Sequence, residues 1–447
     1  MTTLQKLARF AAGFAARPLP PEVTHGAQRA VIDWLASVYP GLDTEAVQRL
    51  EQVLADDLDR GPSRLVDKGT GRAATARAAA LYNGTAAHAA ELDDSFRDAM
   101  YHPGAATIAG ALAVAQATAA SGPVFLRAVV LGYELSTRIG VVMGRPHYRY
   151  WHNTGTMGSF GAAAAAASLM ALDQDATAHA LAIAATFTAG LQQAFRSESM
   201  AKPLHAGRAA EAGVLAAQLA ARGMRSSLDV LEGEAGLGHA MSDGPDWSAI
   251  DATLGKDFHV TRLTFKNHVG CGHNFPAIDG ALALQQQHGF RHGDIDHLQL
   301  GVYQSTLDIA PHVDPRDADQ ARFSLHYMVA TALVHGSVRL AAFEPARLAD
   351  PDTRALMRRT TAALDPEVDA AFPGRRGARV RIRLRDGRTL ERLQPDRKGD
   401  PELPLSDADL EDKLAELAGP AIGKSASRAL ITRIWALHDA PAVATLI

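Results

Sequence analysis

The sequence of 447 residues contains a single cysteine, Cys271, and lacks any long uninterrupted apolar run. One thiol excludes an internal disulfide and a metal site built on several cysteines, and it fits a reducing compartment. Apolar stretches such as residues 160–172 are shorter than the roughly 20 residues that a membrane-spanning helix needs. The formal net charge of -4 shows no excess of positive charge for nucleic acid. We therefore expect a cytoplasmic protein that binds neither membranes nor nucleic acid.

The first residues are basic and carry no acid before Glu22. Lys6, Arg9 and Arg17 among apolar residues have the composition of an organellar presequence. However, apolar residues between positions 4 and 15 recur at helical spacing, and the prolines at 18–21 would stop such a helix. We favour a core helix over a targeting segment.

Length and residue spacing predict two domains. The chain exceeds the roughly 250–300 residues over which one core keeps growing. Alanine-rich segments with helical periodicity occupy residues 73–92, 104–120, 158–172, 174–194 and 205–222. Their composition is typical of closely packed, buried helices. We predict a large all-helical domain over residues 1–257.

Beyond residue 257 the pattern becomes mixed. Strand-like alternation is found at residues 259–265, 297–303 and 378–384, and an Asp-Gly pair between the last of these and residues 388–393 predicts a hairpin. Helical patterns at 274–289 and 321–335 lie between the strands. We predict an inserted α+β domain over residues 258–398. A Ser-x-x-Asp start at Ser406 predicts one more helix in residues 399–447. Periodicity alone does not show where this segment packs.

A first polar segment interrupts the helical half near its alanine-rich segment 73–92. On a continuous helix, His88, Glu91 and Ser95 share one face, while Asp93 and Asp94 turn aside. Acid, hydroxyl and imidazole would then converge at a helix end, where a histidine precedes a proline. The alternative is that the two aspartates cap or solvate the helix end and His88 is a hydrogen-bonded core histidine.

Two further polar segments stand just before alanine-rich helices. Residues 148–156 supply imidazole, amide and hydroxyl groups where helix N-termini favour anions. Capping of the helix by Thr154 or Thr156 explains them equally well. Lys202 precedes a proline within a run of Ala, Gly and Met, where it can act as a base or clamp a carboxylate. Most lysines, in contrast, are solvated surface groups.

A fourth segment, at residues 266–276, contains two histidines and the cysteine. His268, Cys271 and His273 suggest metal ligands, but neither a Cys-x-x-Cys pair nor a His-Glu-x-x-His pattern accompanies them. We expect no metal.

Taken in order, these segments resemble the MmgE/PrpD family, which includes 2-methylcitrate dehydratase, cis-aconitate decarboxylase and iminodisuccinate epimerase. The likeness spans nearly the whole chain. It rests on residues 19–23, 83–95 with 102–103, 132–134, 152–156 with 158–161, 202–205, 233–236, 321–324 and 399–406.

The resemblance implies a multidomain α and α+β fold in which residues 399–447 complete the helical domain. It also implies a cleft where the two domains meet, a homodimer, and catalysis without metal or cofactor. Three departures weaken the match to cis-aconitate decarboxylation. Glu91 replaces a common Asp, Ser95 replaces a common Thr, and His312 stands where the decarboxylase uses a tyrosine.

Our leading hypothesis is a lyase that removes a proton α to a carboxylate of a small di- or tricarboxylate and completes a β-elimination. Lys202 and His152 would hold carboxylates or stabilise the enolate, and His102 with Glu91 would protonate the leaving group. Alternatives are decarboxylation of the cis-aconitate type and a carboxylate-binding protein without turnover. A further alternative is epimerisation of the iminodisuccinate type, with Lys202 and Tyr148 as the two bases. The length of the loop between Ser95 and His102 resembles that of the epimerase more than that of the decarboxylase or the dehydratase.

The expected site therefore draws on both halves of the chain. The predicted catalytic residues are Glu91, His102, His152, Lys202 and Tyr148, and the predicted substrate-binding residues are Ser95, Asp94, His205, His273 and His312.

Overall fold

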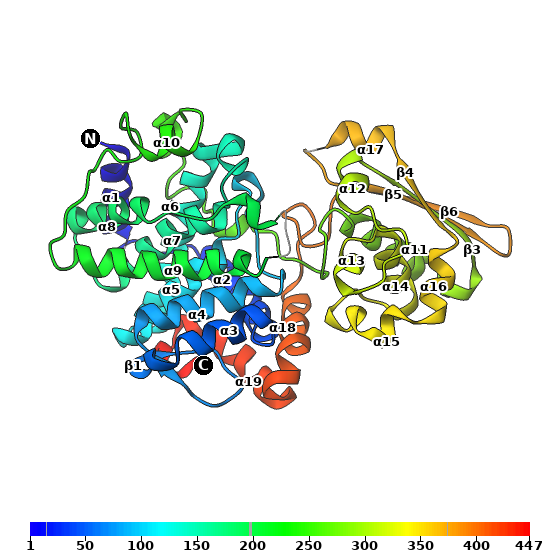
Figure 1. Ribbon diagram of the computed structural model, residues 1–447, viewed down its shortest axis with the longest axis horizontal. Helices are drawn as coiled ribbons and strands as arrows, with labels where there is room; N and C mark the ends of the chain where they lie inside the picture. The colour runs from blue at the N-terminus through cyan, green and yellow to red at the C-terminus, as the bar shows by residue number, and fades with distance from the viewer. Residues whose placement is uncertain (15, 196–198, 373) are drawn as a thin grey trace. The chain divides into compact units, whose positions relative to one another are not determined.

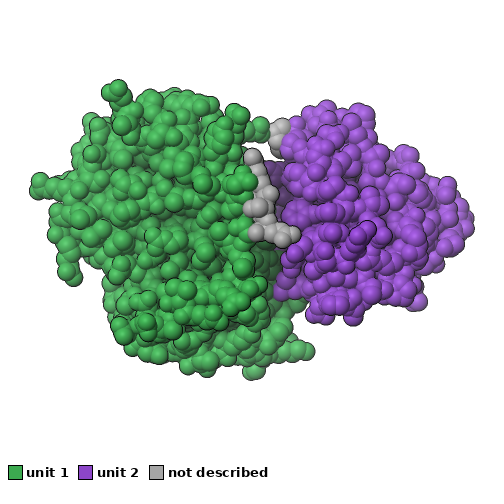
Figure 2. Space-filling model, viewed as in Figure 1, with its two compact units in different colours: residues 1–265, 406–447 green, residues 266–405 purple. Residues whose placement is uncertain are grey.

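The computed structural model describes residues 1–14, 16–195, 199–372 and 374–447 (Figure 1). The chain forms two compact units (Figure 2): unit 1 holds residues 1–265 and 406–447, and unit 2 holds residues 266–405. This is the predicted fold class, a large helical part that includes the C-terminal segment and a smaller α+β part. The domain limits predicted at 257/258 and 398/399 stay a prediction.

Unit 1 is built almost entirely of helices, together with a short antiparallel pair of strands, β1 (Leu58–Arg64) and β2 (Ala73–Ala74). The helices of unit 1 are α1 (Thr3–Phe14), α2 (Pro21–Gly41), α3 (Glu45–Val53), α4 (Ala76–Ala89), α5 (Pro103–Ala117), α6 (Gly122–Tyr148), α7 (Asn153–Leu169), α8 (Gln174–Thr186), α9 (Ala201–Ala220), α10 (Leu237–Met241), α18 (Asp407–Ile422) and α19 (Lys424–Trp435).

Helices α5, α7 and α9 run side by side through the core of unit 1, and α4 packs on α5 and α9 (Figure 1). Small side chains permit this close packing. A Cβ added to Gly213 of α9 would lie 2.5 Å from the Cβ of Ala162 in α7, which is too close for two carbon atoms. The predicted alanine-rich core helices are thus confirmed, and they approach one another closely.

The C-terminal segment packs within unit 1. Helix α18 lies against α2 and begins at Ser406, where the predicted capping box forms with Asp409. Ser406 Oγ accepts from the Asp409 N–H, and the Asp409 carboxylate accepts from the Ser406 N–H. The segment that periodicity could not place therefore supports the helical unit.

Unit 2 contains a four-stranded sheet in the order β4-β3-β5-β6. Strand β3 (Ile295–Val302) pairs parallel with β4 (Thr360–Leu364) and antiparallel with β5 (Ala378–Leu384), and β5 forms the predicted hairpin with β6 (Thr389–Gln394). Helices α11 (Phe275–His288) and α14 (Leu325–His335) pack against the strands (Figure 1). The remaining helices of the unit are short: α12 (Gln304–Ile309), α13 (Ala318–Arg322), α15 (Pro345–Leu348), α16 (Pro351–Met357) and α17 (Pro366–Ala371).

The strand predicted at residues 259–265 is wrong. His259–Arg262 form a 3₁₀ turn, and Thr264 makes an isolated bridge with Ser95. His259 stacks on Phe96 with ring centroids 4.6 Å apart, and its neighbour Val260 is also buried. Consecutive buried residues do not follow the alternation of a strand, so tertiary packing overrides the local pattern.

Among the described residues, none of the helices combines the length and the apolar character that crossing a bilayer requires.

Candidate active site

Four helix ends of unit 1 carry the titratable side chains that the sequence analysis singles out. His88 lies in the last turn of α4, His102 is the N-cap of α5, and His152 is the N-cap of α7. His205 lies near the start of α9. We call these four residues the imidazole cluster, because their rings follow one another in contact.

His88 is the centre of the cluster and is fully buried. Its ring centroid lies 5.1 Å from that of His102 and 5.3 Å from that of His152. His88 Nδ1 lies 2.7 Å from Oδ2 of the buried Asp93, which as a carboxylate accepts the ring N–H. His88 Nε2 is buried and has no hydrogen-bond partner among the described residues. The reading of His88 as a hydrogen-bonded buried histidine thus agrees with the geometry.

His102 is held in one tautomer by the backbone. Its Nδ1 lies 2.7 Å from the carbonyl oxygen of Asp94, which can only accept, so Nδ1 carries the proton. The carboxylate Oδ2 of Asp93 lies 3.6 Å from the same nitrogen. When the ring is neutral, Nε2 holds the lone pair and can take a proton. A proton taken at Nε2 can later be returned from the same atom.

His152 and His205 form a pair whose Nδ1 atoms lie 3.0 Å apart. Burial lowers the pKa of His152 well below its ordinary value, helped by the neighbouring His88, Lys202, His102 and His205. Burial also lowers the pKa of His205, followed by His88 and Lys202. Both rings are therefore neutral near pH 7, and one Nδ1–H donates to the other Nδ1. The pair then holds opposite tautomers, so one Nε2 has a lone pair and the other a proton.

Lys202, in the first turn of α9, forms an ion pair with Glu91. The Lys202 side chain is 21% exposed and that of Glu91 is 43% exposed, so the pair is reachable from solvent. The predicted single helix face of His88, Glu91 and Ser95 is wrong, because α4 ends at Ala89 and Glu91 has a left-handed φ of 59°. The turn, not the helix, points Glu91 at Lys202.

Asp94 belongs to the framework behind the cluster. It is buried, its Oδ2 accepts from the hydroxyl of Tyr133 at 2.7 Å, and its Oδ1 accepts from the N–H of Gly104 at 3.0 Å. Burial, followed by the charge of Asp33, raises the pKa of Asp94 to about 8. Asp94 therefore satisfies a backbone N–H in the first turn of α5, as the capping alternative expects, whereas Asp93 binds His88 instead. A direct contact of Asp94 with substrate stays a prediction.

This shift predicts a pH-dependent stability that depends on Asp94. Between its ordinary pKa of 3.8 and about 8, folded Asp94 keeps a proton that the unfolded chain has lost. Stability contributed by this group therefore falls as pH rises, by up to about 1.4 kcal/mol per unit, and levels off above pH 8. Asp94→Asn keeps an oxygen for Gly104 and removes the titration. Urea unfolding at pH 6, 7 and 8 should show a shallower decline in the variant, and equal slopes would contradict the assignment.

The structure does not bring Tyr148 and Ser95 into the imidazole cluster. Tyr148 ends α6 with 38% of its surface exposed. Ser95 is half-buried and pairs through its backbone with Thr264, with N–O distances of 2.9 and 2.8 Å. Neither side chain has a described hydrogen bond to a cluster residue, so their roles stay predictions.

His273 and His312 belong to unit 2. His273 Nδ1 lies 2.7 Å from the hydroxyl of Tyr303, and burial, followed by Arg376 and Arg397, lowers the pKa of His273 to about 4. His312 is half-buried in the segment after α12. Their predicted contacts with substrate are not tested by the geometry of unit 2 alone.

Thr154 and Thr156 do not cap α7. Thr154 Oγ1 accepts from the backbone N–H of His102 at 3.3 Å, and Thr156 Oγ1 lies 2.8 Å from Nε2 of the buried His147. No side chain caps this helix among the described residues. Thr154 thus helps to seat His102, which agrees with the reading of this segment as part of a site.

One group of described residues could hold a metal ion. His88, Asp93 and His102 offer ligand atoms within 4.8 Å of one another. The Nδ1 atoms of both rings take part in short hydrogen bonds, so a metal would either replace those bonds or bind at Nε2. The expectation of no metal stays a prediction.

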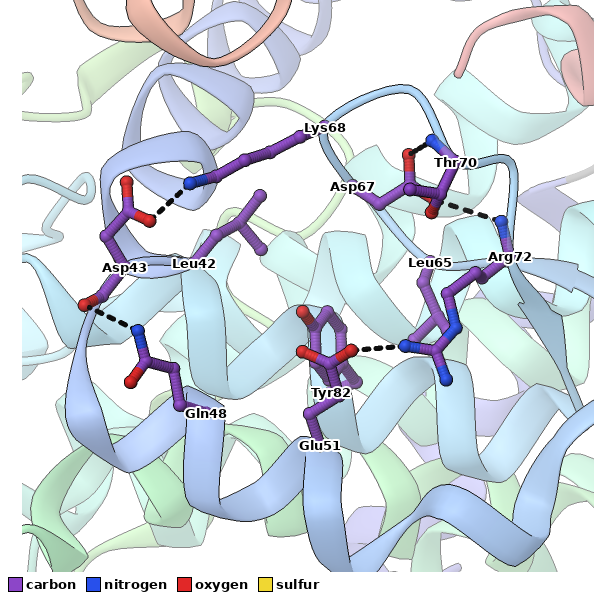
Figure 3. Close-up of a pocket in the computed structure, with 10 residues that line it drawn as sticks. All are labelled: Leu42, Asp43, Gln48, Glu51, Leu65, Asp67, Lys68, Thr70, Arg72 and Tyr82. Atoms are coloured by element: carbon purple, nitrogen blue, oxygen red, sulfur yellow. Dashed lines mark hydrogen bonds and ion pairs between the residues drawn. The ribbon is translucent and has the colours of Figure 1, made fainter.

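A separate hollow of about 300 Å³ lies in unit 1 beside α3 and α4 (Figure 3). Its cations are already paired, Lys68 with Asp43 and Arg72 with Glu51. Asp67 adds a third carboxylate, which accepts from backbone N–H groups of its own loop. Three carboxylates against two cations repel an anionic ligand, so this hollow does not suit a polycarboxylate.

Asp93 and His88 are central here, although the sequence analysis does not select them as site residues. The signal that could have found them is an acid that follows an imidazole by five residues, although Glu91 and Asp94 offer competing acids in the same segment. The contact depends on where α4 ends, and that end has neither glycine nor proline to mark it.

Two family models match the chain. The model of the MmgE/PrpD N-terminal domain matches residues 5–250, and that of the MmgE/PrpD C-terminal domain matches residues 268–439. Among curated proteins, a cis-aconitate decarboxylase-like protein of Aspergillus oryzae is 27% identical, covering 96% of this chain and 93% of its own length. The cis-aconitate decarboxylases of Mus musculus and Homo sapiens are 24% and 26% identical, covering 96% and 81% of this chain and 89% and 76% of their own lengths.

Proposed function

Because the chain belongs to the MmgE/PrpD family, as its motifs indicate, we propose that it is a lyase that forms a carbanion next to a carboxylate of a small di- or tricarboxylate. The observation that carries the proposal is the imidazole cluster beside Lys202. Rings with fixed tautomers can take and return protons, and a lysine can hold the negative charge of the substrate.

The first candidate reaction is β-elimination of water. A neutral imidazole of the His152–His205 pair removes the proton α to a carboxylate, and Lys202 stabilises the resulting enolate. The C–O bond at the β carbon then breaks as the C=C bond forms. His102 as imidazolium gives its proton to the departing hydroxyl, so that water leaves. One proton has then moved from the α carbon to the imidazole and another from His102 to the leaving water, and the electron pair of the C–H bond has formed the C=C bond.

The second candidate is decarboxylation, which the names of the relatives favour. Here the C–C bond to one carboxylate breaks, and the electron pair of that bond stays on the substrate carbon while the carboxylate leaves as carbon dioxide. The same cation, Lys202, would stabilise that carbanion, and His102 would protonate it. Epimerisation needs two bases on opposite faces of one carbon, and the structure shows no described contact between Tyr148 and the cluster to support it.

Proton NMR of small di- and tricarboxylates in heavy water distinguishes these reactions. Elimination is expected to produce new alkene signals from a hydroxylated substrate. Decarboxylation releases carbon dioxide and places one deuterium on the product, and epimerisation introduces deuterium without an alkene. Saturable binding with neither exchange nor product across the panel would contradict the enzyme proposal and support a carboxylate-binding protein. The homodimer and the cytoplasmic location remain predictions alongside this one.

A further inference from the structure

A fully buried ion pair joins the C-terminal segment to α2, and its lysine also donates to the segment between His88 and His102. Lys413 of α18 and Asp33 of α2 both have side chains with no exposed surface. Lys413 Nζ donates to Asp33 Oδ1 at 2.6 Å and to the carbonyl oxygen of Leu92 at 2.9 Å. Lys413 and Leu92 are 321 residues apart in the sequence. The contact is therefore made only when the C-terminal segment packs within unit 1.

The carbonyl that Lys413 holds lies between two residues with contacts to the cluster region. Glu91 precedes it and pairs with Lys202, and Asp93 follows it and accepts from His88. Glu91 has a φ of 59°, a region that side-chain-bearing residues adopt only when their surroundings hold them there. The hydrogen bond from Lys413 to the carbonyl of Leu92, the residue after Glu91, is such a constraint.

The ion pair is not explained by stability alone. Burying two charges is costly, and apolar pairs of similar volume are often equally stable or more so. An apolar pair, however, could not donate to the carbonyl of Leu92, and a buried carbonyl without a partner is itself destabilising. What Lys413 supplies, and a methionine would not, is the fixed position of this carbonyl.

We propose that Lys413 is a positioning residue for the imidazole cluster, acting through the carbonyl of Leu92 on Glu91 and Asp93. The kinetic part of this inference rests on the proposed function, and the structural part rests on the contacts alone. If the carbonyl is released, the turn relaxes, the Asp93 carboxylate shifts away from His88, and the protonation of the rings changes.

Three sets of substitutions separate positioning from stability. Asp33→Leu with Lys413→Met removes both charges and the donor to Leu92. Asp33→Asn alone removes one charge and keeps that donor. Glu134→Leu with Arg138→Met is the matched control, because this pair in α6 is also buried, at 1% and 6% side-chain exposure, and Arg138 donates to carbonyls at Thr253 and Asp257 instead.

The readouts are ring ¹⁵N NMR signals of the histidines, turnover in the heavy-water assay, and thermal unfolding. In the leucine–methionine variant we expect altered ring signals, a fall in kcat of tenfold or more and a smaller change in KM. Asp33→Asn should leave the ring signals unchanged and keep kcat within about threefold of the value of the parent protein. The control pair should change the unfolding temperature but neither the cluster signals nor kcat.

Unchanged ring signals and kcat in the leucine–methionine variant would overturn the proposal. If that variant does not fold, Asp33→Asn with Lys413→Met takes its place. Failure of both to fold while the control pair folds would also overturn it, because the contact would then serve the fold and not the site. If the parent protein turns over no polycarboxylate, the proposed function fails, and the ring signals still decide the positioning role.

Discussion

Lys202→Met is expected to reduce turnover by about 10²–10³-fold while unit 1 stays folded. Removing one preorganised donor to developing negative charge typically costs a factor of this size. Methionine keeps much of the length and apolar volume of the lysine stem, so the loss is mainly one of charge. Because Lys202 would stabilise the carbanion, kcat should fall along with kcat/KM. Initial rates measured by NMR with the best substrate of the panel test this.

A matched lysine shows whether the effect belongs to the site. Lys68 also pairs with a carboxylate, Asp43, and lies beside the hollow that does not suit an anion. Lys68→Met should leave turnover within about twofold of the parent, as expected for a partly exposed ion pair. Equal losses in the two variants, or normal turnover in Lys202→Met, would remove Lys202 from the mechanism.

The helical part of the fold could be read largely from the sequence, because alanine-rich segments with helical periodicity have few alternatives to buried helices. The hairpin of β5 and β6 could also be predicted from the sequence, because the Asp-Gly pair between its strands is typical of a tight hairpin turn. The short strand β4 was not, because residues 360–364 show little alternation and become a strand by pairing with β3. Pairing of this kind is a tertiary property.

The candidate site could be predicted residue by residue but not as an arrangement. His102, His152 and Lys202 stand out as polar groups at helix starts in an apolar context. Their neighbours depend on how helices far apart in the sequence converge, and the end of α4 at Ala89 decides that Asp93 faces His88. The buried Lys413 was invisible for the same reason, because nothing local marks a lysine of an amphipathic helix as fully enclosed.

The histidine rings of the cluster lie in different surroundings, so they suit different proton-transfer roles. The His152–His205 pair is kept neutral by burial, so it can accept a proton. His102 has its Nδ1 fixed by the carbonyl of Asp94, so its Nε2 is the atom that can carry a proton and return it. His102 is therefore the ring whose loss should affect proton return most.

His102→Asn is expected to lower kcat by about 10²–10⁴-fold, the range that a positioned general acid or base contributes. The amide nitrogen of asparagine can replace Nδ1 and still donate to the carbonyl of Asp94, so the start of α5 should keep its shape. What disappears is Nε2, the atom that we propose exchanges the proton. KM should change much less than kcat, because the proposal places the substrate charge elsewhere, at Lys202.

His179→Asn is the control, since the Nδ1 of that half-buried ring also lies near a backbone carbonyl, 3.2 Å from that of Ser226, but on α8 outside the cluster. It should leave kcat nearly unchanged. A His102→Asn variant that keeps the rate of the parent would assign proton return to another group, and His88, with its buried Nε2, is then the next ring to replace.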